Sequence, residues 1–432
     1  MEIEFGHKFR ARHFPAINRN GFTSVNHGSY GMVPQVLIEK LNELTNQFYS
    51  GPDAYIDEYN VDNYRNALVL MGQLLDCPST NLTFATGDSV AVNTVLRSFP
   101  FEKGDVFVIP NTTYINCKKT FEFLEDSIGI EVVVLDFDLP VTHDTIITEF
   151  EKVFKTRRVK MAFFDTVSSI PSVKFPFREL TSLCKEYGVL SFVDGAHGIG
   201  LFPIRFQEMQ FEPDFFSSNL HKWLHFPYSY TVLYADQKHH KYVQTFPISD
   251  TYKNPETVEE YERYFNDKFE SQTRASYQKL ALIADAIEFR NVACGGEDQI
   301  YNYCTNLSKS IKKMVKERWP GVKVISNEND DHLDSAMTSF YVPHEVSSVF
   351  AEMQQTQRAS HVGKIAKTLV RKHKTFMPLF FFKDRFSFRL SAQIYNELSD
   401  YEYAVDSLKS AVEELFNSEE NLPNFDELKI ES

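Results

Sequence analysis

Short apolar runs alternate with amphipathic segments along the first half of the chain. The runs are rich in β-branched and aromatic residues, which is typical of buried strands, and they cover residues 82–86, 105–109, 131–135, 159–165, 189–194 and 230–234. Apolar positions at helical spacing predict helices in between, over residues 113–126, 144–155 and 176–187. Strands that alternate with helices predict βαβ crossovers and a mainly parallel sheet. The predicted fold class is therefore α/β.

The two ends of the chain follow other patterns. Residues 24–34 are broken by Gly28, Gly31 and Pro34, which predicts an ordered turn before helices over 35–50 and about 62–76. Residues 257–320 are charged and predicted to be helical. A smaller α+β unit is predicted after that, with strands over 322–326, 336–342 and 386–391 and helices over 345–357, 361–373 and 398–416.

Composition narrows the class of protein. The chain has 432 residues, 43% hydrophobic and 24% charged, which is typical of a soluble globular protein. A net charge of −14 argues against nucleic-acid binding. The five cysteines form no CxxC pair and no zinc spacing, so no metal site is expected and a reducing compartment is predicted. The chain has no signal-peptide core and no membrane-length apolar run, which predicts the cytoplasm and no membrane partner.

One lysine stands almost alone in a long apolar stretch. From Pro213 to Ala235 only Asp214 and Lys222 carry a formal charge. Such a lysine either covers apolar surface with its stem or is a reactive amine, because burial lowers the ammonium pKa and leaves a nucleophile. The stretch alone does not choose between these interpretations.

Two further segments favour the reactive amine. Asp194 follows its predicted strand, either as an ordinary N-capping turn or as a carboxylate that keeps a pyridine nitrogen protonated, so that the ring acts as an electron sink. The turn Gly87-Asp88-Ser89 opens a predicted helix, where free N–H groups and a hydroxyl can bind phosphate, although such a turn is also a common N-cap. In this order, at the carboxyl ends of parallel strands, the three parts predict a pyridoxal phosphate site.

With these motifs, the chain resembles the class V branch of the fold-type I pyridoxal phosphate enzymes over residues 5–416. Within it, the chain is most similar to the isopenicillin N epimerase-like and hercynylcysteine sulfoxide lyase group. The segments that carry the resemblance are Phe5–Arg10, Asn26–Gly31, Ala91–Ser98, Thr112–Tyr114, Val193–His197, His221–Leu224, Cys294–Glu297 and Arg389–Asn396. The resemblance implies a seven-stranded, mainly parallel sheet in a large cofactor-binding domain (51–290) and a small α+β domain (291–432). Residues 1–50 would pack on the small domain and the active site.

The resemblance also implies roles for individual residues. Lys222 would form the Schiff base with pyridoxal 5′-phosphate and then move the proton at the substrate α-carbon, and Asp194 would pair with the pyridine nitrogen. Tyr114 would stack on the ring, with His197 near its hydroxyl. The other expected cofactor contacts are Asp88, Ser89, Asn219 and His221 at the phosphate, Ser169, and Thr273 from the partner subunit of a homodimer.

Substrate binding is expected at the other end of the site. Arg389 matches the arginine that binds the substrate carboxylate as a bidentate pair. Asn26 and His27, in the N-terminal loop, are expected to contact the substrate. Two segments depart from the family pattern: Pro227-Tyr-Ser229 stands where Pro-Arg-Gly is usual, and Gln272-Thr-Arg-Ala275 where Gly-Thr-x-Asp is usual.

The resemblance favours carbon–sulfur lyase chemistry on a cysteine conjugate or sulfoxide, like that of ergothioneine synthesis, with pyruvate and ammonia as products. An aminotransferase or amino-acid epimerase uses the same lysine and remains an alternative, as does a cofactor-binding descendant without activity. A cysteine desulfurase needs a thiolate on a loop of the small domain, and residues 343–388 contain no cysteine. The predicted partner is a small amino-acid substrate.

Overall fold

The chain folds around a seven-stranded sheet in the computed structural model, which describes residues 3–19, 21–270, 277–326, 335–418, 422–423 and 428. The strand order is β2 (Leu82–Ala85), β8 (Thr231–Ala235), β7 (Phe215–Asn219), β6 (Leu190–Asp194), β5 (Val159–Asp165), β3 (Val106–Pro110) and β4 (Glu131–Leu135). The five strands from β7 to β4 are parallel, and β8 is antiparallel to both of its neighbours. The predicted α/β class and mainly parallel sheet are confirmed.

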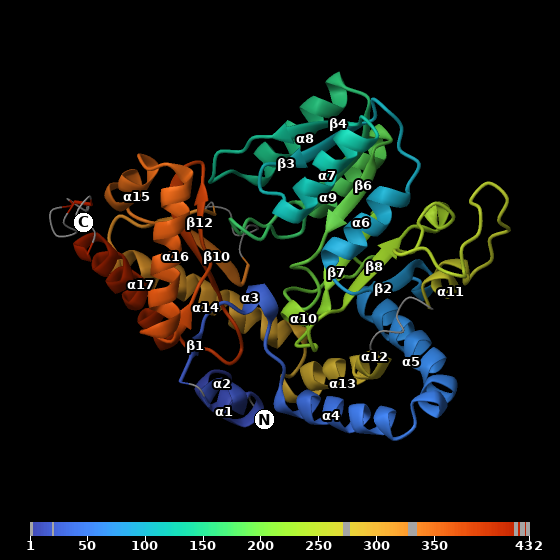
Figure 1. Cartoon of the computed structure of the whole chain (residues 1–432), viewed down its shortest axis with the longest axis horizontal. Helices are drawn as coiled ribbons and strands as arrows, with labels where there is room; N and C mark the ends of the chain where they lie inside the picture. Colours follow the sequence, from blue (N-terminus) through green and yellow to red (C-terminus); the bar gives the residue numbers. More distant parts are fainter. Residues whose placement is uncertain are drawn as a thin grey trace.

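Helices cover both faces of this sheet (Figure 1). Neighbouring residues of one strand point to opposite faces, so Phe163 of β5 packs in a core with α6 (Asp88–Ser98) and α7 (Ile115–Ser127). Phe164, the next residue, packs in a second core with the helices of the other face. Those helices are α5 (Pro52–Leu75), α8 (His143–Thr156) and α9 (Phe177–Tyr187). Burial on both faces is why these strands read as continuous apolar runs.

The C-terminal part is built on a second, antiparallel sheet. Its strand order is β12 (Leu379–Phe382), β13 (Arg385–Ser391), β10 (Met337–Tyr341) and β9 (Lys323–Val324). Phe340 and Phe388 stack across it with ring centroids 5.0 Å apart. Its helices are α14 (Glu297–Arg318), α15 (His344–Ala351), α16 (Gln355–Arg371) and α17 (Leu398–Ser418).

The N-terminal segment connects the two sheets. Helix α1 (His7–His13) is held on the C-terminal part by the ion pair between Arg10 and Asp400, 3.0 Å long, and α2 (Pro15–Asn18) follows it. Strand β1 (Thr23–Ser24) then pairs with β11 (Thr375–Phe376). These contacts agree with the expected packing on the small domain, whereas the boundaries at residues 50 and 290 remain predictions.

A glycine lets the N-terminal segment touch the lysine-bearing helix. Helix α3 (His27–Tyr30) packs against α10 (Leu220–Trp223) and is followed by Gly31, whose φ is 74°. A Cβ on Gly31 would lie 2.0 Å from the carbonyl oxygen of His221. Only glycine therefore permits this close approach beside Lys222.

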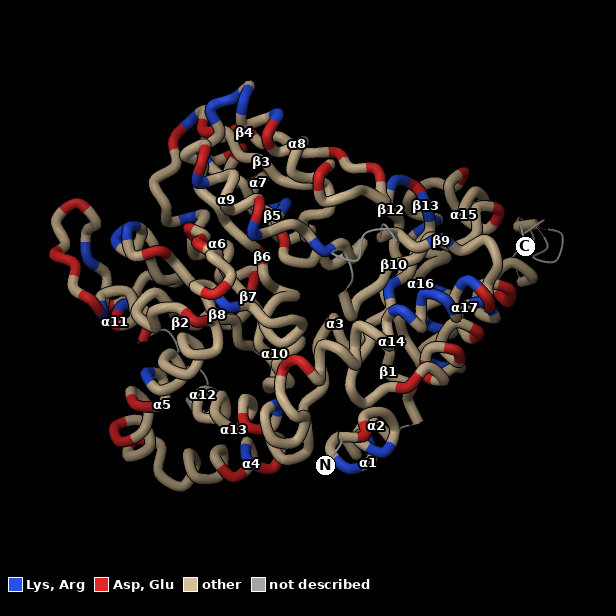
Figure 2. Tube along the Cα trace, turned by 180° about the vertical axis from the view of Figure 1, so that it is seen from behind, with Lys and Arg blue, Asp and Glu red and all other residues tan. Residues whose placement is uncertain are grey.

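The segment from 35 to 293 adds helices around the larger sheet. Helix α4 (Gln35–Ser50) packs on α5 and on α12 (Tyr277–Ala281), and α11 (Tyr264–Glu270) lies against β2. Helix α13 (Ile283–Glu288) continues into a π-helical turn over Phe289–Ala293. Figure 2 shows acidic and basic residues interspersed on the outer helices and loops, without a basic face on the side shown. Among the described residues, no helix is both long enough and apolar enough to span a membrane.

Two predictions of local structure are wrong. Residues 257–263 contain no helix, and α11 begins only at Tyr264, because charged residues without an apolar stripe have no face to bury. Helix α5 begins at Pro52, about one helical stretch earlier than predicted, since proline is well suited to the first helical position.

Candidate active site

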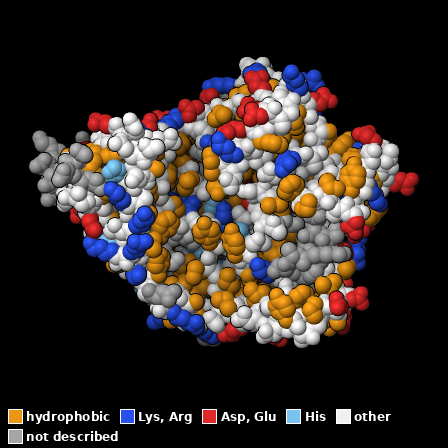
Figure 3. All heavy atoms as spheres, in the orientation of Figure 1, with side chains coloured by type: hydrophobic (Ala, Val, Ile, Leu, Met, Phe, Trp, Pro, Cys, Tyr) orange, Lys and Arg blue, Asp and Glu red, His pale blue; other side chains and the backbone are white. Residues whose placement is uncertain are grey.

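A cavity of about 400 Å³ lies beyond the carboxyl ends of β5, β6 and β7. This is where open α/β sheets bind ligands, and its size is in the range of small-molecule sites. Figure 3 shows this side of the molecule hollowed near its centre, with basic and histidine side chains inside the hollow. Ten of the predicted site residues line the cavity: Asp88, Ser89, Tyr114, Ser169, Asp194, His197, Asn219, His221, Lys222 and Arg389.

Lys222 faces a histidine whose proton position is fixed by a tryptophan. The indole Nε1 of Trp223, which can only donate, donates to Nδ1 of His197 over 3.1 Å. Burial, then the charge of Lys222, holds the pKa of His197 well below its usual range, so the neutral ring carries its proton on Nε2. That nitrogen lies 3.3 Å from Nζ of Lys222.

A hydrogen bond between these two nitrogens requires Nζ to accept. The neutral amine has a lone pair for this and the ammonium has none. Burial also lowers the pKa of Lys222, against the opposing effect of the nearby Asp88 and Asp194. Contact with His197 and burial therefore both favour the nucleophilic form of the amine.

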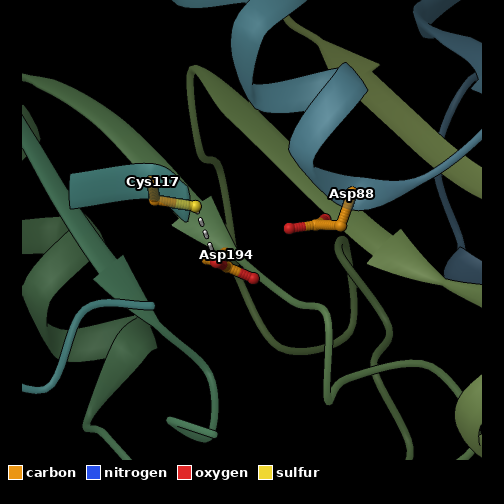
Figure 4. A group of neighbouring side chains, drawn as sticks. All are labelled: Asp88, Cys117 and Asp194. Carbon is orange, nitrogen blue, oxygen red and sulfur yellow. Dashed lines mark hydrogen bonds between the residues drawn. The ribbon is translucent and has the colours of Figure 1, made fainter. Parts of the chain in front are cut away.

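Three carboxyl groups lie close together on the opposite wall of the cavity. Burial raises the pKa of Asp88 to about 8, that of Asp165 to about 8 and that of Asp194 to about 7. Asp88 and Asp194 hydrogen-bond to each other, and we take Asp88 as the proton donor because its pKa is the higher. Figure 4 shows Asp88 and Cys117 directed toward Asp194 from opposite sides.

Asp194 is held in place at its other oxygens. Its Oδ1 accepts from the backbone N–H of Ala196 over 2.9 Å, and its Oδ2 lies 3.8 Å from Sγ of Cys117. Within the described part of the chain, Oδ1 of Asp88 and Oδ2 of Asp165 are buried without a hydrogen-bond partner. Buried acceptors without partners are costly, and a cationic ligand here would satisfy them. A protonated pyridine nitrogen has this chemistry.

Removing the charge of Asp88 is expected to stabilise the apoprotein in a pH-dependent way. The folded-state pKa of about 8 lies above the ordinary value of 3.8, so Asp88 favours the folded state at low pH and this contribution is lost as the pH rises toward 8. In thermal unfolding, Asp88→Asn should therefore raise the melting temperature more at about pH 8.5 than at about pH 6. Asp126→Asn, at an exposed position of α7, is the matched control. Equal effects at the two pH values would contradict the arrangement.

The other end of the cavity offers donors for an anion. Helix α6 begins at Asp88 without a side-chain cap, so N–H groups of its first turn are available beside the Ser89 hydroxyl. Asn219 accepts from Oγ1 of Thr231 over 2.6 Å, which directs its amide –NH₂ away from that bond. His221 is buried next to it, and burial lowers its pKa to about 4. This set of groups fits a phosphate better than any apolar ligand.

Arg389 is fully buried at the third side of the cavity. Its Nη1 donates to the carbonyl oxygen of Ser169 over 2.9 Å, and its Nη2 donates to Oδ1 of Asn26 over 2.8 Å and to Oγ of Ser29 over 2.9 Å. All of these partners are neutral. Burial lowers the pKa of Arg389 to about 10, and its Nε has no partner among the described residues. A buried guanidinium without a counter-ion favours binding of a carboxylate.

The comparisons with known proteins agree with this geometry. The sequence profile described as aminotransferase class-V matches residues 31–403. The chain belongs to the class-V aminotransferase family. Family membership makes pyridoxal 5′-phosphate the cofactor, as predicted, and the donors, acceptors and amine described above fit its phosphate, its ring nitrogen and its aldehyde.

Individual relatives cover almost the whole chain. It is 28% identical over 410 residues to the hercynylcysteine sulfoxide lyase of Schizosaccharomyces pombe, with 94% of this chain and 97% of that protein aligned. It is 27% identical over 430 residues to the L-cysteine desulfhydrase-like protein lolT1 of Epichloe uncinata, with 92% and 94% aligned. A solved complex of the cystine C–S lyase C-DES with its product cysteine persulfide shares the fold, with a TM-score of 0.73 at 14% identity over 91% of this chain and 98% of that one.

Two predicted residues are not brought to the cavity. His27 is buried behind it, where Nδ1 lies 2.8 Å from the Tyr395 hydroxyl and the ring packs 5.0 Å from that of Trp223. The structure therefore gives His27 a packing position rather than the expected substrate contact. Asn26 reaches the site only through Arg389. Thr273 lies outside the described residues, as does the atypical segment 272–275.

Sequence reasoning assigned no role to two residues of the site. Asp165 ends β5 beside Asp194 on β6, and the strand-end position of both was the available signal. Ser29 bonds to Arg389 and lines the cavity, but nothing in the sequence set it apart from the neighbouring loop residues.

The atypical segment Pro227–Ser229 lies at the mouth of the cavity. Ser229 has φ of 80°, a conformation that suits the glycine usual in the family, and its Oγ donates to the carbonyl of Thr86 over 2.7 Å. Ser229→Gly and Ser229→Ala both lose this bond, but only glycine relieves the strain. We expect Ser229→Ala to be less stable than Ser229→Gly by about 1 kcal/mol, as measured by urea unfolding of the two variants in parallel. The opposite order would contradict the backbone conformation.

Proposed function

We propose that this protein is a pyridoxal phosphate-dependent carbon–sulfur lyase that cleaves a cysteine conjugate or sulfoxide and releases pyruvate and ammonia. The observation that carries the proposal is the pairing of a neutral Lys222 amine with a buried, unneutralised Arg389 across one cavity. The similarity to the hercynylcysteine sulfoxide lyase of Schizosaccharomyces pombe, over almost the full length of both chains, supports sulfur chemistry.

The cavity walls assign the cofactor a position. Asp194, with Asp88 behind it, would hold the protonated ring nitrogen, and the first turn of α6 with Ser89, Asn219 and His221 would bind the phosphate. Tyr114 lines the same cavity and is assigned to the ring by the family pattern. When bound there, pyridoxal phosphate supplies an electron sink for the charge that develops at the substrate α-carbon.

Arg389 is proposed to bind the substrate carboxylate. Its two terminal nitrogens are already oriented by Ser169, Asn26 and Ser29, so the planar fork is pre-organised for a bidentate contact. An anionic ligand removes the cost of an unpaired buried cation. Binding of the carboxylate at this wall fixes the α-carbon on the Lys222 side of the cavity.

Lys222 is proposed to move the proton at the α-carbon. His197 accepts from Trp223 and donates toward Nζ, which keeps the lone pair of the amine directed within the cavity. The pKa of Lys222 is lowered by burial, which brings the amine closer to the range in which general bases work at neutral pH. Burial of the walls excludes water from the α-carbon.

The assembly and location are also proposals. We infer a homodimer in which Thr273 reaches the partner's cofactor phosphate, on the strength of the family resemblance. The five cysteines are unpaired, which supports a reducing compartment and the cytoplasm. The boundaries of the large domain (51–290) and the small domain (291–432) belong to the same proposal.

The test is release of pyruvate from a panel of cysteine S-conjugates and sulfoxides by the purified holoenzyme. The lyase proposal predicts stoichiometric pyruvate and ammonia from at least one conjugate. A second measurement follows the absorbance of the bound cofactor in a single half-reaction. Conversion to the amine form of the cofactor without pyruvate would indicate an aminotransferase, and racemisation of the amino acid without pyruvate would indicate an epimerase. Either outcome would replace the lyase proposal.

A further inference from the structure

Three tyrosines surround the mouth of the cavity. Tyr30 ends α3, Tyr114 precedes α7, and Tyr228 lies in the atypical segment after α10; all three line the cavity. Their exposed fractions are 68%, 39% and 59%, which are large for aromatic side chains next to a binding site. The rings of Tyr30 and Tyr228 are 6.0 Å apart between centroids. Tyr114 lies close to both, because their phenols, after burial and Cys117, raise its pKa.

Charged side chains line only the interior of the cavity. Asp165, Asp194 and Arg389 are at most 3% exposed. The exposed lining residues within the described chain are all uncharged: Tyr30, Thr86, Tyr114, Asn116, Ile170 and Tyr228. Tyr228 occupies the position of the arginine in the usual Pro-Arg-Gly segment, so the mouth of this chain has an aromatic ring where a cation is expected.

The position of the substrate follows from the interior groups. Under the proposed function, on which this step rests, Arg389 holds the carboxylate and Lys222 lies at the α-carbon. Both contacts are at the buried walls, so the group carried by the substrate sulfur extends to the open mouth. A ring there can stack on Tyr30 and Tyr228 or meet them edge to face.

We propose that Tyr30 and Tyr228 select substrates whose sulfur carries a planar aromatic or heteroaromatic group, neutral or cationic. The faces of tyrosine rings carry negative partial charge and attract cations as well as ring edges. An anionic substituent is disfavoured by the same ring faces and by the three carboxyl groups inside the cavity.

Binding can be measured without turnover. Replacing the sulfur of S-benzyl-L-cysteine by a methylene gives an isostere that cannot lose a thiol, and its cyclohexyl counterpart has the same length and reach. Calorimetric titration of the holoenzyme should show the benzyl isostere binding about three- to tenfold more tightly than the cyclohexyl one. The carboxybenzyl isostere should bind more weakly than the benzyl one.

Variants assign the preference to the two rings. Tyr30→Ala and Tyr228→Ala should each reduce the ratio of the two affinities toward one, whereas Tyr228→Phe retains the ring and should retain the ratio. Tyr252→Ala, at an exposed tyrosine outside the cavity, is the matched control and should leave the ratio unchanged. Tyr228 also packs on His221 with ring centroids 4.7 Å apart, so Tyr30→Ala provides a test that does not disturb the phosphate end.

The outcomes separate this inference from the proposed function. A holoenzyme without the aromatic preference, or with a preference that both alanine variants retain, would overturn the inference. Pyruvate release from S-benzyl-L-cysteine alongside that result would leave the lyase proposal intact. Preference for the benzyl isostere without pyruvate from any conjugate would support the tyrosine pair and overturn the lyase.

Discussion

Replacing Lys222 with alanine is expected to reduce pyruvate release by at least about a thousandfold. Its amine is the one that faces the neutral His197 inside the cavity, at 3.3 Å, and no other lysine lines the cavity in the described chain. The variant loses both the covalent bond to the cofactor and the base at the α-carbon. The measurement is the initial rate of pyruvate formation, with the visible absorbance of the bound cofactor followed on the same sample.

Lys222→Arg is the matched control for this prediction. It retains a positive charge near Asp88 and Asp194 but cannot form a Schiff base, so its rate should fall as far as that of Lys222→Ala. If Lys222→Arg kept more than about a tenth of the activity, the charge of Lys222 and not its amine would be responsible, and the assignment of Lys222 as the reactive amine would fail.

Replacing Arg290 with alanine is expected to destabilise the protein by about 3 kcal/mol, through loss of a buried ion pair. Arg290 is 1% exposed and bonds to both carboxylate oxygens of Glu297, over 2.5 and 2.6 Å. It also donates to the carbonyls of Trp223 over 2.7 Å and of Gly200 over 2.9 Å. The variant leaves Glu297 without its partner and two backbone carbonyls without their donor.

The position of Arg290 gives this loss a consequence for the site. Trp223 follows Lys222 directly, and Gly200 ends the turn that carries Asp194 and His197. The guanidinium therefore ties together the two segments that hold the cofactor. We expect Arg290→Ala to lower the free energy of unfolding in urea and to weaken cofactor binding together.

A double variant separates the two causes. Arg290→Ala with Glu297→Gln removes the unpaired carboxylate and should recover part of the unfolding free energy. It should not recover cofactor affinity, because the carbonyls of Trp223 and Gly200 still lack a donor. Full cofactor affinity in Arg290→Ala would contradict the role of Arg290 in positioning Lys222.

The large sheet and most of the site could be predicted from sequence, for physical reasons that can be stated. Strands buried on both faces form continuous apolar runs, so β3, β5 and β6 were predicted close to their observed bounds. Asp194 and Lys222 stood out because each is a charge at the edge of such a run. Family resemblance supplied Arg389, which as one arginine on a strand has no local signal.

Other features depend on contacts between distant segments. Arg290 lies in the π-helical turn after α13, and no periodicity in the sequence marks that turn. His27 is a loop histidine whose side chain turns toward Trp223 and Tyr395 instead of the cavity, a choice made by packing between three segments. The direction of the Asp88 carboxyl toward Asp194 likewise follows from how α6 meets the end of β6. Short-range patterns carry no information on such contacts.

The most direct test of the account is to locate the covalent bond to the cofactor. The protein contains a second buried lysine, Lys268, whose pKa is lowered by burial to about 7, but whose Nζ donates to the carbonyls of His240 over 2.8 Å and Val243 over 2.7 Å. Borohydride reduction of the holoenzyme followed by peptide mass spectrometry would identify the modified residue. The account predicts the reduced pyridoxyl phosphate group on Lys222. The group on Lys268 or another lysine, or no modified lysine at all, would contradict it.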